Sequence, residues 1–87
     1  MYYVYVLYSR SYDEFYLGST KDLKRRFEEH KTGKNPSTRK ADDWIVSYYE
    51  AYLSEQAVTK REACLKRSGK AYVSLKRRIR ESLNQII

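Results

Sequence analysis

The chain has 87 residues, ten of them tyrosine, and its 18 Lys and Arg against 11 Asp and Glu give a net charge of +7. One cysteine excludes an internal disulfide framework, no apolar run approaches the roughly 18 residues of a membrane span, and Met1-Tyr2-Tyr3-Val4 lacks the basic start of a signal peptide. We therefore expect one small domain over residues 1–87, located in the cytoplasm and with no membrane partner.

The first 18 residues predict a β-hairpin. Residues 2–8 are aromatic and β-branched, which is typical of a strand buried on nearly both faces. A polar turn over residues 9–14 separates this strand from residues 15–18, its expected hairpin partner. Gly18 should end the second strand, where the backbone must bend or approach another group closely.

A helix is predicted after the hairpin. Thr20 or Asp22 can cap its N-terminus, and Gly33 is a plausible stop. Three residues at helical spacing then share one face of this helix: Leu23, Phe27 and His30.

The rest of the chain predicts one more strand and two helices. Residues 34–43 form a polar loop, and the aromatic segment 44–52 reads as a third strand. Ser54 can cap a helix that runs to about residue 67, with Cys64 on its buried side, and a last helix spans residues 71–83 after a break at Ser68-Gly69. The order is ββαβαα, so we expect an α+β fold with a small three-stranded mixed or antiparallel sheet flanked by helices.

The net charge lies entirely in the last third of the chain. Residues 1–55 hold nine basic and nine acidic residues, whereas residues 56–87 hold nine basic residues against Glu62 and Glu81. Such a basic block, densest at residues 76–80, favours a polyanionic partner, although it is also typical of an ordinary soluble helix face.

Five short motifs, taken in order, resemble the signature of the GIY-YIG nuclease family. They are Tyr3-Val4-Tyr5, Tyr16-Leu17-Gly18, Ser19-Thr20 with Asp22-Leu23, Arg26 with His30, and the set Glu55, Ala57, Glu62, Leu65 and Lys66. The resemblance covers essentially the whole chain. It is closest to small stand-alone bacterial members, which are similar to the N-terminal catalytic domain of the excision-repair nuclease and so suggest DNA repair.

The sequence departs from the family pattern at three places. Tyr3 stands where the signature has its first glycine, and Ser19 stands where some members carry a lysine. A late asparagine of several nucleases has no clear counterpart, since Asn84 lies too far past Glu62. The fold assignment does not depend on these three positions.

Glu62 is the metal ligand that the resemblance implies. Mg²⁺ (or Mn²⁺) takes few protein ligands and fills its shell with water and phosphate oxygens, so a single glutamate is chemically sufficient. Helical spacing places Glu62 beside Val58 and Leu65, at the edge of the apolar stripe. The alternative is an ordinary helix glutamate that pairs with Lys66 at i+4.

Arg26 and His30 lie one helical turn apart. The planar guanidinium of Arg26 suits bidentate phosphate contact, so we expect it to stabilise the transition state, whereas Arg25 should face solvent or DNA. His30, the only histidine, can transfer a proton or contact phosphate; alternatively it completes the apolar face of its helix.

Tyr5 and Tyr16 can converge on one face of the predicted hairpin. A phenol has a pKa near 10, so either becomes a base for water only when a metal or nearby cations stabilise the phenolate. The resemblance implies this role without selecting one of the two, and the alternative is core packing.

Further residues are candidates for contacts with nucleic acid: Gly18, Thr20, Lys21, Arg39, Lys40, Lys76, Arg77 and Arg78. Within residues 34–40, Ser37 and Thr38 are expected either to touch phosphate with their neighbours or to belong to a solvated loop. Cys64 and His30 together cannot build a zinc site.

These residues favour a small metal-dependent endonuclease that nicks DNA. A monomer with one site should cut one strand, and the compact chain makes branched, flapped or single-stranded DNA a natural expectation. The alternative is a nucleic-acid-binding module without useful catalysis, which uses the basic segment 76–80. A protein-interaction domain with a basic helix is the third class.

Overall fold

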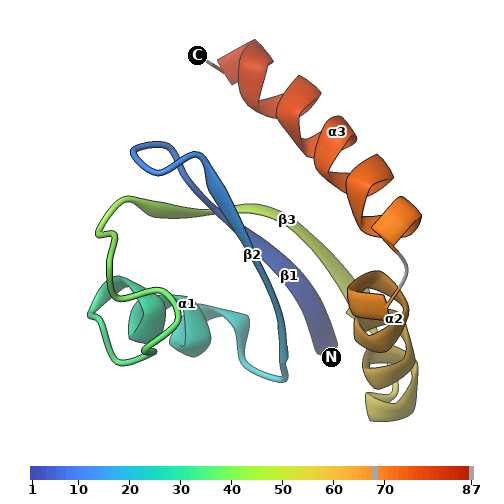
Figure 1. The fold of residues 1–87 in the computed structure, drawn as a ribbon. Helices are drawn as coiled ribbons and strands as arrows, with labels where there is room; N and C mark the ends of the chain where they lie inside the picture. The colour runs from blue at the N-terminus through green and yellow to red at the C-terminus, as the bar shows by residue number, and fades with distance from the viewer. Residues whose placement is uncertain (68, 87) are drawn as a thin grey trace.

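The computed structural model describes residues 1–67 and 69–86, and it confirms the α+β fold with the order ββαβαα. The sheet is antiparallel throughout, with the spatial order β2-β1-β3. Its elements are β1 (Tyr2–Ser9), β2 (Glu14–Thr20), α1 (Leu23–Lys31), β3 (Trp44–Tyr52), α2 (Glu55–Arg67) and α3 (Gly69–Ile86). In Figure 1 the sheet separates α1 from the α2–α3 pair, so helices cover both of its faces.

The central strand β1 is buried on both faces, as its sequence predicts. Val4 and Val6 point to a core that they form with Leu65 of α2 and Ile79 of α3. The residues that alternate with them point the other way and pack with Trp44 and with residues of α1. We call these the α2/α3 face and the α1 face.

Strand β2 extends to Thr20, so the expectation that Gly18 ends it is wrong. Gly18 lies opposite Tyr5 in the β1–β2 register. A Cβ atom at Gly18 would lie 2.6 Å from the Tyr5 hydroxyl oxygen. The glycine therefore makes room for the Tyr5 ring within a continuous strand, and the backbone does not need to turn there.

The cap residues of α1 and α2 behave as predicted. The Asp22 carboxylate accepts a hydrogen bond from the Arg25 N–H, which makes Asp22 the N-cap of α1. Gly33 has a φ of +78°, a conformation that favours glycine after a helix end. The Ser54 hydroxyl likewise accepts from the Ala57 N–H at the start of α2.

Helix α3 is longer than predicted at both ends. It begins at Gly69, so the predicted break at Ser68-Gly69 is wrong for Gly69, while Ser68 lies outside the described residues. At the other end it continues past Leu83, whose half-buried side chain packs on the α2/α3 core. Among the described residues, none of the three helices has the length and apolar content to cross a bilayer.

A register shift in β3 is absent from the sequence-based prediction. Val6 pairs with Tyr48 but Leu7 pairs with Val46, so Ser47 is an extra residue, and its hydroxyl donates to the Val6 carbonyl over 2.9 Å. The shift turns Tyr48 toward the α2/α3 face and Val46 toward the α1 face. Because β3 carries aromatic residues on both faces, its sequence pattern does not reveal where the alternation of side chains changes.

Candidate active site

Four of the five predicted catalytic residues meet on the α1 face. Tyr5 comes from β1, Tyr16 from β2, and Arg26 and His30 from α1. The Tyr5 hydroxyl and His30 Nε2 are hydrogen-bonded at 2.9 Å. The Tyr16 ring centre lies 4.9 Å from that of His30 and 6.4 Å from that of Tyr5. The two tyrosines therefore converge on the histidine of the neighbouring helix.

A buried chain of hydrogen bonds continues from His30 into the following loop. His30 Nδ1 lies 2.6 Å from the Thr38 hydroxyl, and the Thr38 carbonyl accepts from the Trp44 indole N–H over 2.7 Å. His30 and Thr38 have no solvent exposure. Both expectations for Thr38, a phosphate contact or a solvated loop residue, are therefore wrong, because Thr38 fixes the orientation of the His30 ring.

The sequence gives only a weak signal for this part of the site. Thr38 follows Pro36 in a polar segment, where a threonine is ordinarily a surface residue. A histidine on the apolar face of α1 needs a hydrogen-bond partner when it is buried. That need predicts that some polar residue of the following loop bonds to the His30 ring. Pattern alone does not select Thr38.

Burial keeps the central phenol and imidazole neutral at neutral pH. It raises the pKa of Tyr5 to about 12, although a hydrogen bond from Arg26 works in the opposite direction. Burial also lowers the pKa of His30, and the positive charge of Arg26 lowers it further. The fixed cation of the cluster is therefore the guanidinium of Arg26.

Arg26 is held by two partners. Its Nη1 donates to Glu29 Oε1 over 3.0 Å, and its guanidinium lies close enough to the Tyr5 hydroxyl for each group to shift the pKa of the other. Glu29 first, and then Tyr5, raise the pKa of Arg26. About a third of its side chain is exposed, and Arg25 is exposed as predicted. Arg26 can therefore meet an incoming phosphate while it remains attached to the buried cluster.

Glu62 of α2 contacts strand β2 from the α2/α3 face of the sheet. Ser19 Oγ donates to Glu62 Oε1 over 2.6 Å, and Lys66 Nζ lies 2.8 Å from Oε2. Ser19 pairs with Val4 while its neighbour Gly18 pairs with Tyr5, and adjacent strand residues point to opposite faces. The Glu62 charge nevertheless contributes to the raised pKa of Tyr5, so it lies within electrostatic range of the cluster.

The Glu62 carboxylate fits the single protein ligand that Mg²⁺ requires. Burial alone would raise the pKa of Glu62, but the hydrogen bonds from Lys66 and Ser19 outweigh it and lower the pKa. The group is thus ionised and 21% exposed, and its ion-pair partner, the Lys66 ammonium, is 57% exposed. Within residues 1–67 and 69–86, no three His, Cys, Asp or Glu side chains cluster as a larger metal site would need. Water and phosphate oxygens would complete the shell.

A second polar network anchors the turn of α2 that carries Glu62. The Glu50 carboxylate of β3 accepts two hydrogen bonds from the Arg61 guanidinium, both 2.9 Å long. It also accepts from the Tyr48 and Tyr52 hydroxyls. Sequence reasoning missed this network, although an acid among tyrosines at period two in a predicted strand is a usable signal.

The predicted nucleic-acid contacts near the α1 face have different surroundings. Gly18 is buried under the Tyr5 ring. The Thr20 hydroxyl accepts from the Asp22 N–H, and Lys40 pairs with Glu14. Lys21 and Arg39 are exposed and carry no resolved ion pair among the described residues. Among the predicted contacts on this side, these two lysine and arginine side chains are the ones placed to meet phosphate.

The basic residues of α3 lie on the opposite side of the sheet from Tyr5 and His30 (Figure 1). Arg77 and Arg78 are exposed, and Lys76 Nζ sits 4.5 Å above the Tyr72 ring. Lys76 and Arg77 line a surface depression of about 320 Å³ together with Val73 and Arg80. The densest positive charge is thus separated by the sheet from the cluster of Tyr5, Tyr16, Arg26 and His30.

Comparison with protein families bears on this arrangement directly. A family model described as the GIY-YIG catalytic domain matches residues 1–80. The chain belongs to the GIY-YIG family. This GIY-YIG domain has a nuclease-type fold, and the match spans all the predicted catalytic residues. No curated protein and no solved structure matches the chain in the corresponding comparisons.

Proposed function

We propose that this GIY-YIG protein is a metal-dependent endonuclease that hydrolyses phosphodiester bonds in DNA, one strand at a time. The observation that carries the proposal is the cluster on the α1 face, in which the Tyr5 hydroxyl is hydrogen-bonded to His30 Nε2 and lies near the Arg26 guanidinium. A partly exposed cation beside neutral phenol and imidazole groups suits the binding of one phosphate. DNA repair, the cytoplasm and a monomeric state stay predictions from the sequence.

The two tyrosines take different roles in this proposal. Tyr5 is 1% exposed, and its pKa of about 12 makes it a poor proton acceptor. Tyr16 is half-buried and packs on the His30 ring, so its hydroxyl is the one that can approach a water molecule. Tyr16 orients the attacking water through its hydroxyl, and Tyr5 holds Arg26 and His30 in place.

Arg26 binds the scissile phosphate and stabilises the negative charge that develops in the transition state. His30, fixed by Thr38, supports Tyr5 and the geometry of the cluster. Glu62 would hold the metal ion in place of its present Lys66 partner. Mg²⁺ or Mn²⁺, when bound, polarises the phosphodiester and neutralises charge on the leaving oxygen.

Nicking of supercoiled plasmid in Mg²⁺ or Mn²⁺ tests the proposal. Arg26→Ala and Glu62→Gln should abolish nicking while the folded state persists by circular dichroism. Arg25→Ala, on the same helix as Arg26, and Glu81→Gln, which neutralises an exposed acid of α3, are the matched controls and should nick as wild type. Wild-type protein that binds DNA and cuts none of the offered substrates contradicts the proposal.

A nucleic-acid-binding module without catalysis is the second candidate. The specific observation in its favour is that both oxygens of Glu62 already have partners, Ser19 and Lys66. Binding would then depend on the depression that Lys76 and Arg77 line on α3. In that case Lys76→Ala with Arg77→Ala removes binding, and Arg26→Ala leaves binding unchanged.

A further inference from the structure

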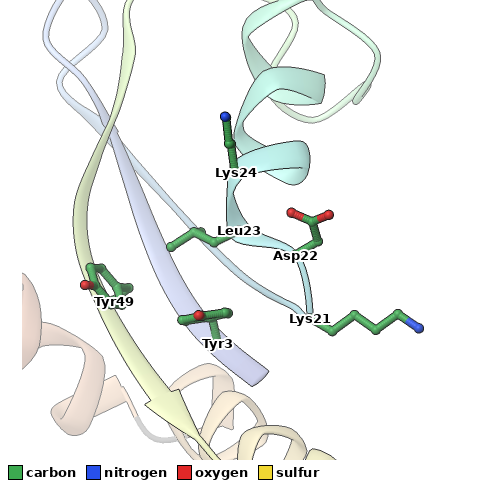
Figure 2. Close-up of a pocket in the computed structure, with 6 residues that line it drawn as sticks. All are labelled: Tyr3, Lys21, Asp22, Leu23, Lys24 and Tyr49. Atoms are coloured by element: carbon green, nitrogen blue, oxygen red, sulfur yellow. The ribbon is translucent and has the colours of Figure 1, made fainter. Parts of the chain in front are cut away.

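A pocket of about 440 Å³ opens on the α1 face next to the candidate active site. Its lining residues are Tyr3, Lys21, Asp22, Leu23, Lys24 and Tyr49 (Figure 2). The Tyr3 and Tyr49 rings meet edge to face, with centroids 5.9 Å apart and planes at 67°. Tyr49 is 56% exposed, so the fold leaves a large part of this aromatic surface uncovered.

The strand register places this pocket directly beside Tyr5. Tyr49 is the β3 partner of Tyr5, and Tyr3 lies two residues before Tyr5 on the same face of β1. Tyr3 is also the residue that replaces the first glycine of the family signature. A glycine there would provide no aromatic wall, so the pocket is a feature of this chain's own sequence.

We propose that the Tyr3–Tyr49 pocket binds an unpaired nucleobase next to the bond that is cut, which makes single-stranded or flapped nucleic acid the substrate. This inference rests on the proposed nuclease function. Aromatic side chains stack on the faces of all bases, and such stacking is the usual means of binding single strands. In a duplex those faces are covered by neighbouring base pairs, so a duplex cannot use the tyrosine pair.

The charges around the pocket suit a nucleotide. Lys21 and Lys24 contribute two positive charges against one negative charge of Asp22. The Asp22 carboxylate already accepts the Arg25 N–H, and Figure 2 shows it directed away from the two tyrosines. In the same view Lys21 extends outward, away from the two tyrosines, where its ammonium would meet a phosphate of the bound strand outside the pocket. The pocket volume lies within the roughly 300–1,000 Å³ of small-ligand sites.

Binding measured in EDTA, where no cutting occurs, tests the pocket separately from the nuclease. The probe is a fluorescein-labelled oligothymidylate, compared with a duplex of equal length by fluorescence anisotropy. Tyr49→Ala and Tyr3→Gly should each weaken single-strand binding about 5- to 100-fold, the range expected for one lost stacking contact. Duplex binding should stay unchanged. Tyr49→Phe keeps the ring and should bind as wild type.

Two controls keep the result specific. Tyr12→Ala removes an exposed tyrosine of the β1–β2 turn and should leave single-strand binding unchanged. A 2-aminopurine placed in the strand should be quenched by wild-type protein and not by Tyr49→Ala. If both pocket variants bind the single strand as wild type does, or if sedimentation shows a dimer that Tyr49→Ala dissociates without loss of strand binding, the inference is overturned.

Failure of the inference differs from failure of the proposed function. A protein that binds and quenches the single strand in EDTA but never nicks in Mg²⁺ or Mn²⁺ retains the pocket and loses the nuclease. A protein that nicks, while Tyr49→Ala and Tyr3→Gly cut single-stranded and duplex DNA in the wild-type ratio, retains the nuclease and loses the pocket.

Discussion

The two faces of the sheet bury different kinds of side chains. On the α2/α3 face, Val4, Val6 and Leu65 form an apolar core with residues of α3. On the α1 face, two of the least exposed side chains are His30 and Thr38, both polar. In the described part of the chain, every buried side-chain polar atom has a hydrogen-bond partner. The α2/α3 face is therefore mainly apolar packing, whereas the α1 face combines an apolar cluster around Trp44 with Tyr5, Arg26 and His30; among the residues proposed to act on phosphate, Glu62 alone comes from α2.

Among the variants that distinguish the two faces, Leu65→Ala should have the largest effect on the unfolding free energy. Leu65 is 1% exposed in the α2/α3 core, and such truncations cost about 2–5 kcal/mol of unfolding free energy. Urea denaturation measures this loss. The nicking rate of the fraction that remains folded should match wild type, because Leu65 does not contact Tyr5, Arg26 or His30, and Glu62, one turn earlier on α2, keeps its hydrogen bond from Ser19.

Leu53→Ala is the matched control, since Leu53 is 87% exposed and its truncation should change the unfolding free energy little. The proposed difference between the two faces is contradicted if Leu65→Ala lowers the unfolding free energy by less than about 1 kcal/mol, or if it removes nicking from fully folded protein.

Glu50→Gln should have the next largest effect on the unfolding free energy, and this effect should depend on pH. Burial alone would raise the pKa of Glu50, but hydrogen bonds from Arg61, Tyr48 and Tyr52 outweigh it and lower the pKa to about 2 from the usual 4.5. A lowered carboxyl pKa stabilises the fold above the unfolded value, and this stabilisation is lost as pH falls from about 4.5 to about 2.

We expect Glu50→Gln to cost about 2–3 kcal/mol at neutral pH and to flatten the stability profile in that acid window. Thermal unfolding across pH measures both, with the exposed Glu81→Gln as control. A variant profile that still falls in parallel with wild type between pH 4.5 and pH 2 excludes Glu50 as the titrating group.

His30→Gln is the corresponding test on the α1 face. An amide cannot serve both the Tyr5 hydroxyl and Thr38, so unfolding free energy should drop by about 1–2 kcal/mol at neutral pH. Burial lowers the pKa of His30, so the folded state prefers the neutral ring and wild-type stability decreases as pH falls below 6.5.

The variant should lose this decrease near pH 6.5 and keep the acid transition of Glu50. Chemical denaturation at a series of pH values resolves the two windows. Wild type and His30→Gln with the same slope below pH 6.5 would show that His30 does not titrate on unfolding.

Much of the cluster on the α1 face could be predicted from the sequence, because its members fall into two pairs that each belong to one local element. Tyr5 and Tyr16 belong to one hairpin, and Arg26 and His30 lie one turn apart on one helix, so local periodicity places each pair, and the resemblance to the family signature joined the two pairs in one site. The extra residue Ser47 changes which side chains of β3 point to each face, and no local pattern announces it. The side of the sheet on which α3 packs depends on the whole topology, so the sequence does not show that the sheet separates the basic segment from Tyr5 and His30.

The smallest effect should come from the basic helix, because the sheet separates it from the cluster. Lys76→Ala with Arg77→Ala removes two exposed or half-exposed cations from α3. Each lost phosphate contact should lower the slope of log affinity against log salt by about one unit, so DNA binding weakens at low salt and differs little at high salt. The nicking rate at saturating DNA should stay at the wild-type value, since neither residue reaches Tyr5, His30 or Arg26. A double variant that binds normally but nicks slowly would place α3 at the scissile phosphate and break the division between the two faces.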